Sequence, residues 1–133
     1  MTRYLLDTTA LIDFSKGYEP AVSRILDMLE AGAEVGVCDV SVAEFFTGLP
    51  SEAQPFWEEF ITSLAYFVTT RQTAIQAGKY RREFSGMGLT LSVPDALIAA
   101  VARERGTVLV THNTKHYPMT DIELLALERG PRN

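Results

Sequence analysis

The chain has 133 residues and a net charge of −5, with 47% hydrophobic and 22% charged residues. This length suits one domain with one core, and the lack of a basic surplus excludes a protein that coats nucleic acid through bulk charge. The longest strictly apolar run, residues 96–102, is too short to span a bilayer, and the N-terminus lacks the features of a signal peptide. We therefore expect a single cytoplasmic domain over residues 1–133, without membrane association.

The first half of the chain alternates short strands with helices. Strands are indicated by brief β-prone runs, and helices by apolar residues at helical spacing behind a capping residue or a proline. The expected elements are a strand at 4–6, a helix capped by Thr8 or Thr9 that runs to Lys16, a helix from Pro20 to Gly32, a strand at 34–38, a helix capped by Ser41 that runs to Leu49, and a helix around Pro55 that reaches about residue 63.

The second half has its clearest pattern in one apolar helix. Ser92 and Asp95 form a capping box, Pro94 lies in the first turn, and Gly106 ends the helix after Arg105. Because this helix is apolar on every face, we expect other elements to enclose it. The remaining expected elements are a strand at 66–68, a helix at 72–84, a strand at 108–110, a last strand or terminal helix at 122–127, and a frayed tail at 129–133.

The alternation of short strands and helices predicts an α/β fold with a mostly parallel central sheet between layers of helices. In such sheets, ligands collect beyond the carboxyl ends of the strands. Asp7 and Asn113 each follow a strand, Asp95 opens a helix, and Glu44 projects from the helix after the second strand. Oxygen ligands of this kind suit Mg²⁺ or Mn²⁺ better than zinc. The only cysteine, Cys38, is expected to be buried and inert.

Each of these polar residues also has a purely structural interpretation. Asp7 could cap the helix that follows it, and Asp95 completes a capping box at the positive end of a helix dipole. Glu44 lies opposite an apolar stripe and could belong to a solvated helix face. Asn113 could be a turn residue and Thr111 a strand-terminal hydroxyl. Their residue types alone do not decide between these interpretations and a metal site.

The order of four segments resembles the PIN-domain ribonucleases, and within them the VapC-type toxins of toxin–antitoxin pairs. The segments are LLDTTALI at 5–12, SVAEFFTGL at 41–49, PDALIAA at 94–100 and LVTHN at 109–113. The resemblance covers residues 4 to about 127. It implies a three-layer α/β/α sandwich and a Mg²⁺- or Mn²⁺-dependent endoribonuclease that acts as the toxin of a type II toxin–antitoxin system. It further implies an RNA substrate of the tRNA or rRNA class, a small antitoxin protein as partner, and a homodimer.

The resemblance also implies roles for particular residues. Asp7, Glu44 and Asp95 take the positions of the family's acidic metal ligands. Asn113 takes a fourth ligand position, and Thr111 matches the family's usual hydroxyl residue. In this interpretation, metal-activated water attacks the phosphate, so no protein nucleophile is required.

One departure from the family pattern lies just beyond this site. The family often shows Asn-x-x-Asp-Phe where this chain has Asn113 followed by His116 and Tyr117. Neutral imidazole is a weaker ligand for Mg²⁺, so a second cation on this side should be held less tightly. We therefore place His116 outside the core site, as a surface histidine in a loop. His112 is interpreted in the same way, with contact to a substrate phosphate as the alternative.

A basic cluster, Arg71, Lys79, Arg81 and Arg82, could contact RNA phosphates, with a solvated helix face as the alternative. Two other functions remain open. A phosphohydrolase of the haloacid dehalogenase type also has an aspartate after its first strand, but it requires a second aspartate where this chain has Thr9. A catalytically silent PIN-like module that binds only its partner is the second alternative.

Overall fold

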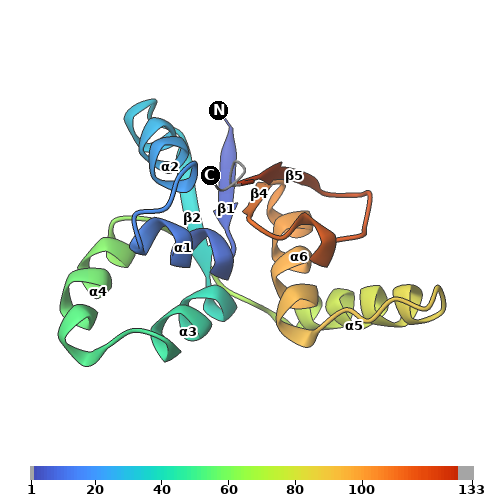
Figure 1. Ribbon diagram of the computed structural model, residues 1–133. Helices are drawn as coiled ribbons and strands as arrows, with labels where there is room; N and C mark the ends of the chain where they lie inside the picture. The colour runs from blue at the N-terminus through green and yellow to red at the C-terminus, as the bar shows by residue number, and fades with distance from the viewer. Residues whose placement is uncertain (1, 129–133) are drawn as a thin grey trace, which may run out of the picture.

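Five parallel strands form the centre of the protein in the computed structural model, which describes residues 2–128 (Figure 1). The strand order is β3-β2-β1-β4-β5, so the first strand is central and the two halves of the chain extend to either side of it. All neighbouring strands pair in parallel, which confirms the predicted α/β class. The strands are β1 Arg3–Leu6, β2 Glu34–Cys38, β3 Ala65–Phe67, β4 Val108–Thr111 and β5 Glu123–Ala126.

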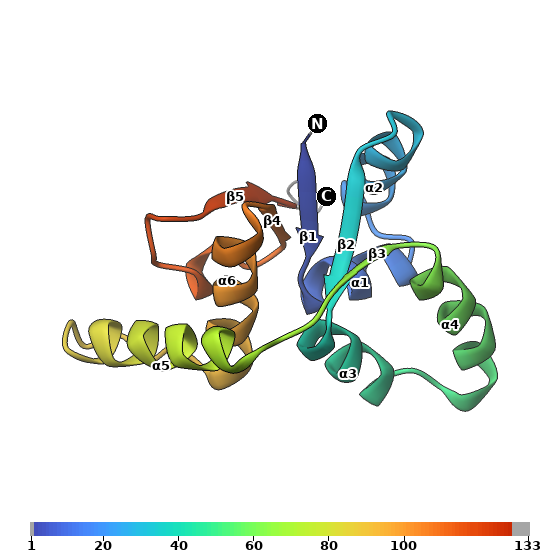
Figure 2. The same cartoon turned by 180° about the vertical axis from the view of Figure 1, so that it is seen from behind.

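Helices cover both faces of this sheet, as the two opposite views show (Figures 1 and 2). Successive strand residues point to opposite faces, so Leu5 and Leu109 join one core with α5 and α6. Leu6 and Val110 join the other core with α1, α2 and α4. No helix in residues 2–128 is long and apolar enough to cross a membrane. The helices are α1 Thr8–Ser15, α2 Ala21–Glu30, α3 Asp39–Thr47, α4 Gln54–Thr62, α5 Arg71–Ser85 and α6 Val93–Arg105, with 3₁₀ turns at Ser51–Ala53 and Thr114–His116.

The structure corrects one sequence-based prediction, the start of α3, and decides one open alternative, the type of the last element. The prediction that Ser41 caps α3 is wrong, because α3 begins at Asp39 and Ser41 lies inside its first turn. The Ser41 hydroxyl accepts the Cys38 N–H at 3.3 Å, so it still satisfies a backbone donor at the helix start. Residues 122–127 contain the strand β5 rather than a helix. The expected frayed tail at 129–133 lies outside the described residues.

The central apolar helix α6 is enclosed, as its sequence predicts. Ala96 and residues 98–102 are at most 1% exposed. The Ser92 hydroxyl accepts the backbone N–H of Asp95 at 3.2 Å, and α6 ends at Gly106, whose φ of 62° favours glycine. This packing fixes the start of α6 relative to the sheet. Cys38 is also fully buried, as predicted, and burial raises the pKa of its thiol.

Gly36 in β2 is a position where the fold requires glycine. A β-carbon there would lie 2.5 Å from Cε2 of Phe67 and 3.0 Å from the carbonyl oxygen of Ala65. We expect Gly36→Ala to lower the free energy of unfolding by about 1–3 kcal/mol, because the neighbouring strand must shift. Urea denaturation measures this change. Gly78→Ala in α5 is the matched control, because its added methyl group meets nothing within 4 Å and should stabilise the helix by about 0.5–1 kcal/mol.

If Gly36→Ala proves as stable as the wild type, the close packing of β2 against β3 is not as the structure describes it. If the free energy of unfolding falls equally for Gly36→Ala and Gly78→Ala, the loss at Gly36 does not come from its contact with β3.

Candidate active site

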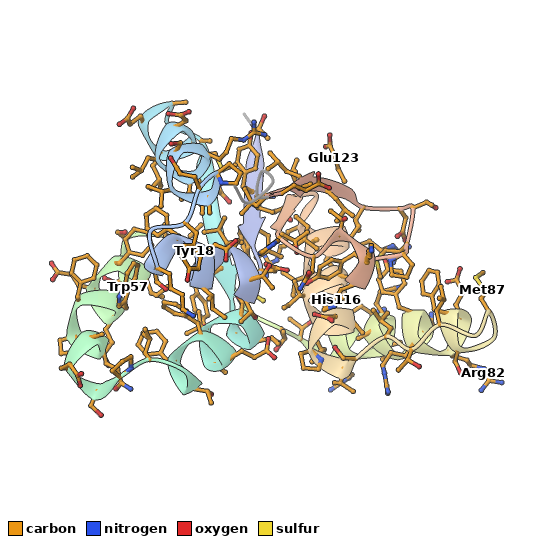
Figure 3. The ribbon with its side chains drawn as sticks, viewed as in Figure 1. Tyr18, Trp57, Arg82, Met87, His116 and Glu123 are labelled. Carbon is orange, nitrogen blue, oxygen red and sulfur yellow. The ribbon has the colours of Figure 1, made fainter. Side chains whose placement is uncertain are left out.

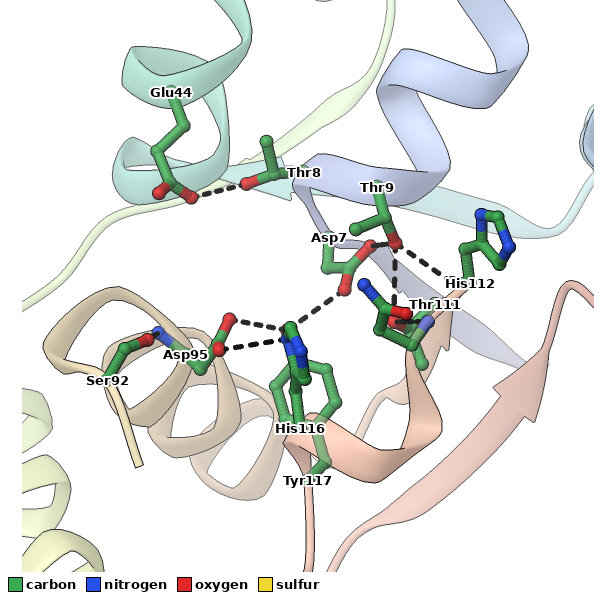
Figure 4. A network of polar contacts seen from close by, with 11 residues as sticks. Asp7, Thr8, Thr9, Glu44, Ser92, Asp95, Thr111, His112, His116 and Tyr117 are labelled. Atoms are coloured by element: carbon green, nitrogen blue, oxygen red, sulfur yellow. Dashed lines mark hydrogen bonds and ion pairs between the residues drawn. The ribbon is translucent and has the colours of Figure 1, made fainter. Parts of the chain in front are cut away.

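The candidate site lies at the carboxyl edge of the sheet, where β1 and β4 end side by side (Figure 4). Asp7 directly follows β1, and its N–H donates to the carbonyl of Val110 in β4 at 3.1 Å. Thr111 is the last residue of β4, and Asp95 lies in the first turn of α6. Three separate elements therefore bring these polar residues to one edge, where ligands of open parallel sheets bind.

The Asp7 carboxylate is almost fully buried, at 2% exposure, and accepts hydrogen bonds on both oxygens. Oδ1 accepts the Ala10 N–H at 3.0 Å and the Thr9 hydroxyl at 2.7 Å. Asp7 is therefore the cap of α1, and the prediction that Thr8 or Thr9 caps this helix is wrong. Burial raises the pKa of Asp7, and its hydrogen bonds offset only part of this effect. A buried carboxylate of this kind favours a bound cation that keeps it ionised.

Asp95 meets Asp7 through a third residue, Tyr117. The Tyr117 hydroxyl donates to Oδ2 of Asp7 at 2.9 Å and lies 3.4 Å from Oδ1 of Asp95. Tyr117 is only 3% exposed, and both its burial and the two carboxylates raise its pKa. Its hydroxyl therefore remains a donor. Sequence reasoning missed Tyr117 as a site residue, although a tyrosine where the family pattern shows phenylalanine was the available signal.

His116 also belongs to this group. Its Nδ1 lies 3.3 Å from Oδ2 of Asp95, and the imidazole is 52% exposed. The sequence indicates that His116 is an exposed loop histidine outside the site. Its exposure is confirmed, but its imidazole lies beside Asp95 and so at the site. The two oxygens of Asp95 thus face different partners: Oδ1 faces Tyr117 and Oδ2 faces His116 (Figure 4).

Glu44 lies beside this pair rather than within it. It is exposed on α3, and its Oε1 accepts the Thr8 hydroxyl at 2.6 Å (Figure 4). Because Thr8 directly follows Asp7, this bond ties α3 to the start of α1 next to the buried carboxylate. Among the described residues, no hydrogen bond joins Glu44 to Asp7 or Asp95; its bond is to Thr8.

Thr9 orders the floor of the site. Its hydroxyl donates to Asp7, accepts the His112 N–H at 2.9 Å, and lies 3.4 Å from Oγ1 of Thr111. Oγ1 of Thr111 in turn accepts the N–H of Asn113, which is exposed, at 2.9 Å. The threonines thus connect the ends of β1 and β4, and place Asn113 at the rim.

His112 is not a free surface histidine, contrary to the sequence-based interpretation. Its Nδ1 lies 2.9 Å from Oδ2 of Asp13, whose side chain is 4% exposed. This contact joins the loop after β4 to α1, next to the Thr9 hydroxyl. His112 therefore has a structural partner that its sequence position did not indicate.

The donor chemistry of the Asp7–Asp95 pair fits a hard divalent cation. Two carboxylates from different elements approach one point, and Mg²⁺ in proteins is often held by one or two carboxylates and several waters. Within residues 2–128, no three His, Cys, Asp or Glu side chains stand close enough together to hold an ion as they are placed. The fit therefore depends on the two aspartates, and Glu44 and Asn113 lie around them.

A family model described as PIN domain matches residues 4–121. The chain belongs to the PIN-domain family. This family membership agrees with the three-layer α/β/α fold that the sequence resemblance implied and that the parallel sheet and its helices confirm. Because the match spans both Asp7 and Asp95, it covers the whole candidate site.

Curated relatives in this family carry ribonuclease names. The chain is 25% identical to Ribonuclease VapC19 of Mycobacterium tuberculosis over 86% of its length and 92% of that protein. It is 27% identical to the tRNA(fMet)-specific endonuclease VapC of Shigella flexneri, covering 88% of this chain and 91% of that one.

Solved structures show the same fold. The chain matches a structure of VapBC2 from Rickettsia felis bound to a promoter DNA fragment with a TM-score of 0.82 and 21% identity, covering 96% of this chain and all of that one. It matches a structure of DNA-bound VapBC from Salmonella typhimurium with a TM-score of 0.79 and 24% identity, covering 96% and 99%. At these identities the likeness establishes the fold alone.

Proposed function

We propose that this PIN-domain protein is a Mg²⁺- or Mn²⁺-dependent endoribonuclease that acts as the toxin of a type II toxin–antitoxin pair and cleaves RNA of the tRNA or rRNA class. The observation that carries the proposal is the convergence of Asp7 and Asp95 on one point at the carboxyl edge of the sheet. The ribonuclease names of the curated relatives support it. Two observations argue against the dehalogenase-type alternative. The PIN-domain model matches residues 4–121, and Thr9 supplies a hydroxyl where that alternative requires a second carboxylate.

In this proposal, each residue of the site would have a distinct role in holding the cation or orienting water. Asp7 and Asp95 hold the cation, and Thr9 fixes the orientation of Asp7 by its 2.7 Å hydrogen bond. A bound Mg²⁺ or Mn²⁺ supplies Lewis acidity to the scissile phosphate and lowers the pKa of water. Glu44 lies next to the pair, where it can orient water or approach the cation. Asn113 would supply a fourth ligand from the rim, and the Thr111 hydroxyl, which accepts the backbone N–H of Asn113 at 2.9 Å, would position it.

RNA contact outside the acidic edge is proposed for α5. A surface groove of about 720 Å³ is lined by Arg81 and Arg82 near the end of this helix. Figure 3 shows Arg82 far from His116, so these cations would contact distant phosphates rather than the scissile one. Arg81 also donates to the Leu91 carbonyl at 2.9 Å and stabilises the loop before α6. Local positive charge of this kind is consistent with a chain whose net charge is −5.

A small antitoxin protein is the proposed partner. A groove of about 340 Å³ between α1, α3 and α4 is lined by apolar residues such as Phe45 and Trp57, and also by Glu44. An apolar partner segment in this groove would cover the Glu44 side of the acidic edge and so block RNA. For homodimerisation, α5, the loop that follows it and α6 each carry an exposed apolar side chain that a second copy could cover, namely Ile75, Met87 and Val93.

The proposal predicts that the purified, partner-free chain cuts structured RNA at discrete positions in the presence of Mg²⁺ or Mn²⁺. EDTA should abolish cleavage, and excess Mg²⁺ should restore it, as mapped by primer extension on tRNA and rRNA. Cleavage that continues unchanged in EDTA would contradict the metal-dependent mechanism. Absence of cleavage with either ion would favour the silent, partner-binding module.

A further inference from the structure

The hydroxyl of Tyr117 stands at the point that a shared cation would use. It donates to Asp7 at 2.9 Å and lies 3.4 Å from Asp95, and the phenol is 3% exposed. Tyr117 follows the 3₁₀ turn Thr114–His116 and belongs to the same core as Leu5 and Leu109. The hydroxyl is therefore held in place by the burial of its own ring, rather than by a flexible loop.

One hydroxyl can satisfy this pair only in part. A tyrosine hydroxyl carries a single proton to donate, and the shorter distance assigns that proton to Asp7. Asp95 then gains little from Tyr117 and has its other oxygen 3.3 Å from His116. A divalent cation would neutralise both carboxylates at once, whereas the hydroxyl stabilises mainly one of them.

We propose that the Tyr117 hydroxyl competes with the divalent cation for Asp7 and Asp95, so that it stabilises the ion-free site and lowers the affinity of the chain for Mg²⁺ and Mn²⁺. This inference rests on the proposed metal-binding role of the two aspartates. Tyr117 is a positioning residue in this scheme. An ion that binds both aspartates must break or weaken the hydrogen bond from Tyr117 to Asp7. The free energy of that bond therefore makes the binding free energy of the ion less favourable.

Tyr117→Phe removes the hydroxyl and keeps the ring. Its Kd for Mn²⁺, measured by isothermal titration calorimetry, should be at least about tenfold lower than that of the wild type, since a hydrogen bond to a charged group no longer has to be broken. The ion-free variant should melt at a lower temperature than the ion-free wild type. At saturating Mn²⁺ this difference should shrink, because the loaded wild type no longer has the full benefit of the bond.

Tyr80→Phe is the matched control. Tyr80 is 2% exposed and donates to Oδ1 of Asp121 at 2.7 Å, so the substitution removes the same kind of bond away from the site. It should lower the melting temperature equally with and without Mn²⁺, and leave the Kd unchanged. In the wild-type chain, the ¹³Cζ resonance of Tyr117 should move on addition of Mg²⁺ while that of Tyr80 stays, which tests the inference even if Tyr117→Phe folds poorly.

Equal Mn²⁺ affinity of Tyr117→Phe and wild type, or weaker binding by the variant, overturns the inference but leaves the metal site standing. A Tyr117 resonance that does not respond to Mg²⁺ overturns it as well. If neither the wild type nor Tyr117→Phe binds Mn²⁺, the inference is overturned together with the proposed metal-dependent function.

Discussion

Asp7→Asn is expected to reduce Mg²⁺-dependent RNA cleavage by more than about 100-fold, because groups that merely orient a metal ligand already contribute about 10- to 100-fold. The variant should still fold. Asparagine is a good helix cap, and its amide oxygen can accept the Ala10 N–H as Asp7 does. Initial cleavage rates and circular dichroism of the two proteins test these two expectations together.

The stability of Asp7→Asn provides a second readout. Burial raises the pKa of Asp7 above its unfolded value, so the ionised carboxylate costs stability at every pH above that unfolded value. At pH 7 the ion-free variant should therefore melt at or above the wild-type temperature. A clear fall in melting temperature would show that the charge is favourable in the ion-free fold, contrary to this expectation.

Asp39→Asn is the control for this substitution. Asp39 opens α3 and accepts the Thr69 N–H and hydroxyl at 2.9 and 3.0 Å, away from the site. The variant should retain cleavage. If Asp39→Asn loses cleavage as severely as Asp7→Asn, the loss does not come from the metal site.

Asp95→Asn is expected to lose cleavage by a similar factor and to lose measurable Mn²⁺ binding. Its capping role is small, since an acid in the first turn of a helix contributes about 0.3–1 kcal/mol. Its metal-binding role should dominate, because its Oδ1 is directed to the same point as Asp7. Cleavage assays and calorimetry, both carried out well below the melting temperature, measure the two losses.

Ser92→Ala separates the capping role of this helix start from the role of the Asp95 carboxylate. It removes the hydroxyl that accepts the Asp95 N–H and should lower stability by about 0.5–2 kcal/mol, while both carboxylates remain. Cleavage should persist below its melting temperature. Equal loss of cleavage in Ser92→Ala and Asp95→Asn would assign Asp95 a structural role only.

Local patterns in the sequence predicted most of the fold. α6 was predictable because the Ser92 cap, the apolar run and Gly106 all mark the same helix; of the predicted capping box, the structure has the bond from the Asp95 N–H to Ser92, while the Asp95 carboxylate faces Tyr117 and His116. The segment at 122–127 was not, because six apolar-rich residues fit both periodicities, and its strand state depends on pairing with β4. The cap of α1 could not be chosen from the sequence, because Asp7, Thr8 and Thr9 are all good capping residues just after the strand, and only the hydrogen bond from the Ala10 N–H identifies Asp7.

The candidate site was predictable only in its ligand types. Asp7 and Asp95 stand out as acids at strand and helix ends, and the order of the family's segments assigned them metal-binding positions. The contacts of Tyr117 could not be predicted, because they join residues 110 and 22 positions apart. Likewise, the position of Glu44 depends on how α3 packs beside α1, which fixes its bond to Thr8.

Calorimetric titration of Mn²⁺ into wild type, Asp7→Asn, Asp95→Asn and the double variant tests most directly whether the two aspartates hold one ion between them. If they do, the wild type binds an ion that each single variant loses, and the double variant shows no further loss. Single variants that bind Mn²⁺ with wild-type affinity, or that lose two separate ions, would contradict a shared cation at Asp7 and Asp95.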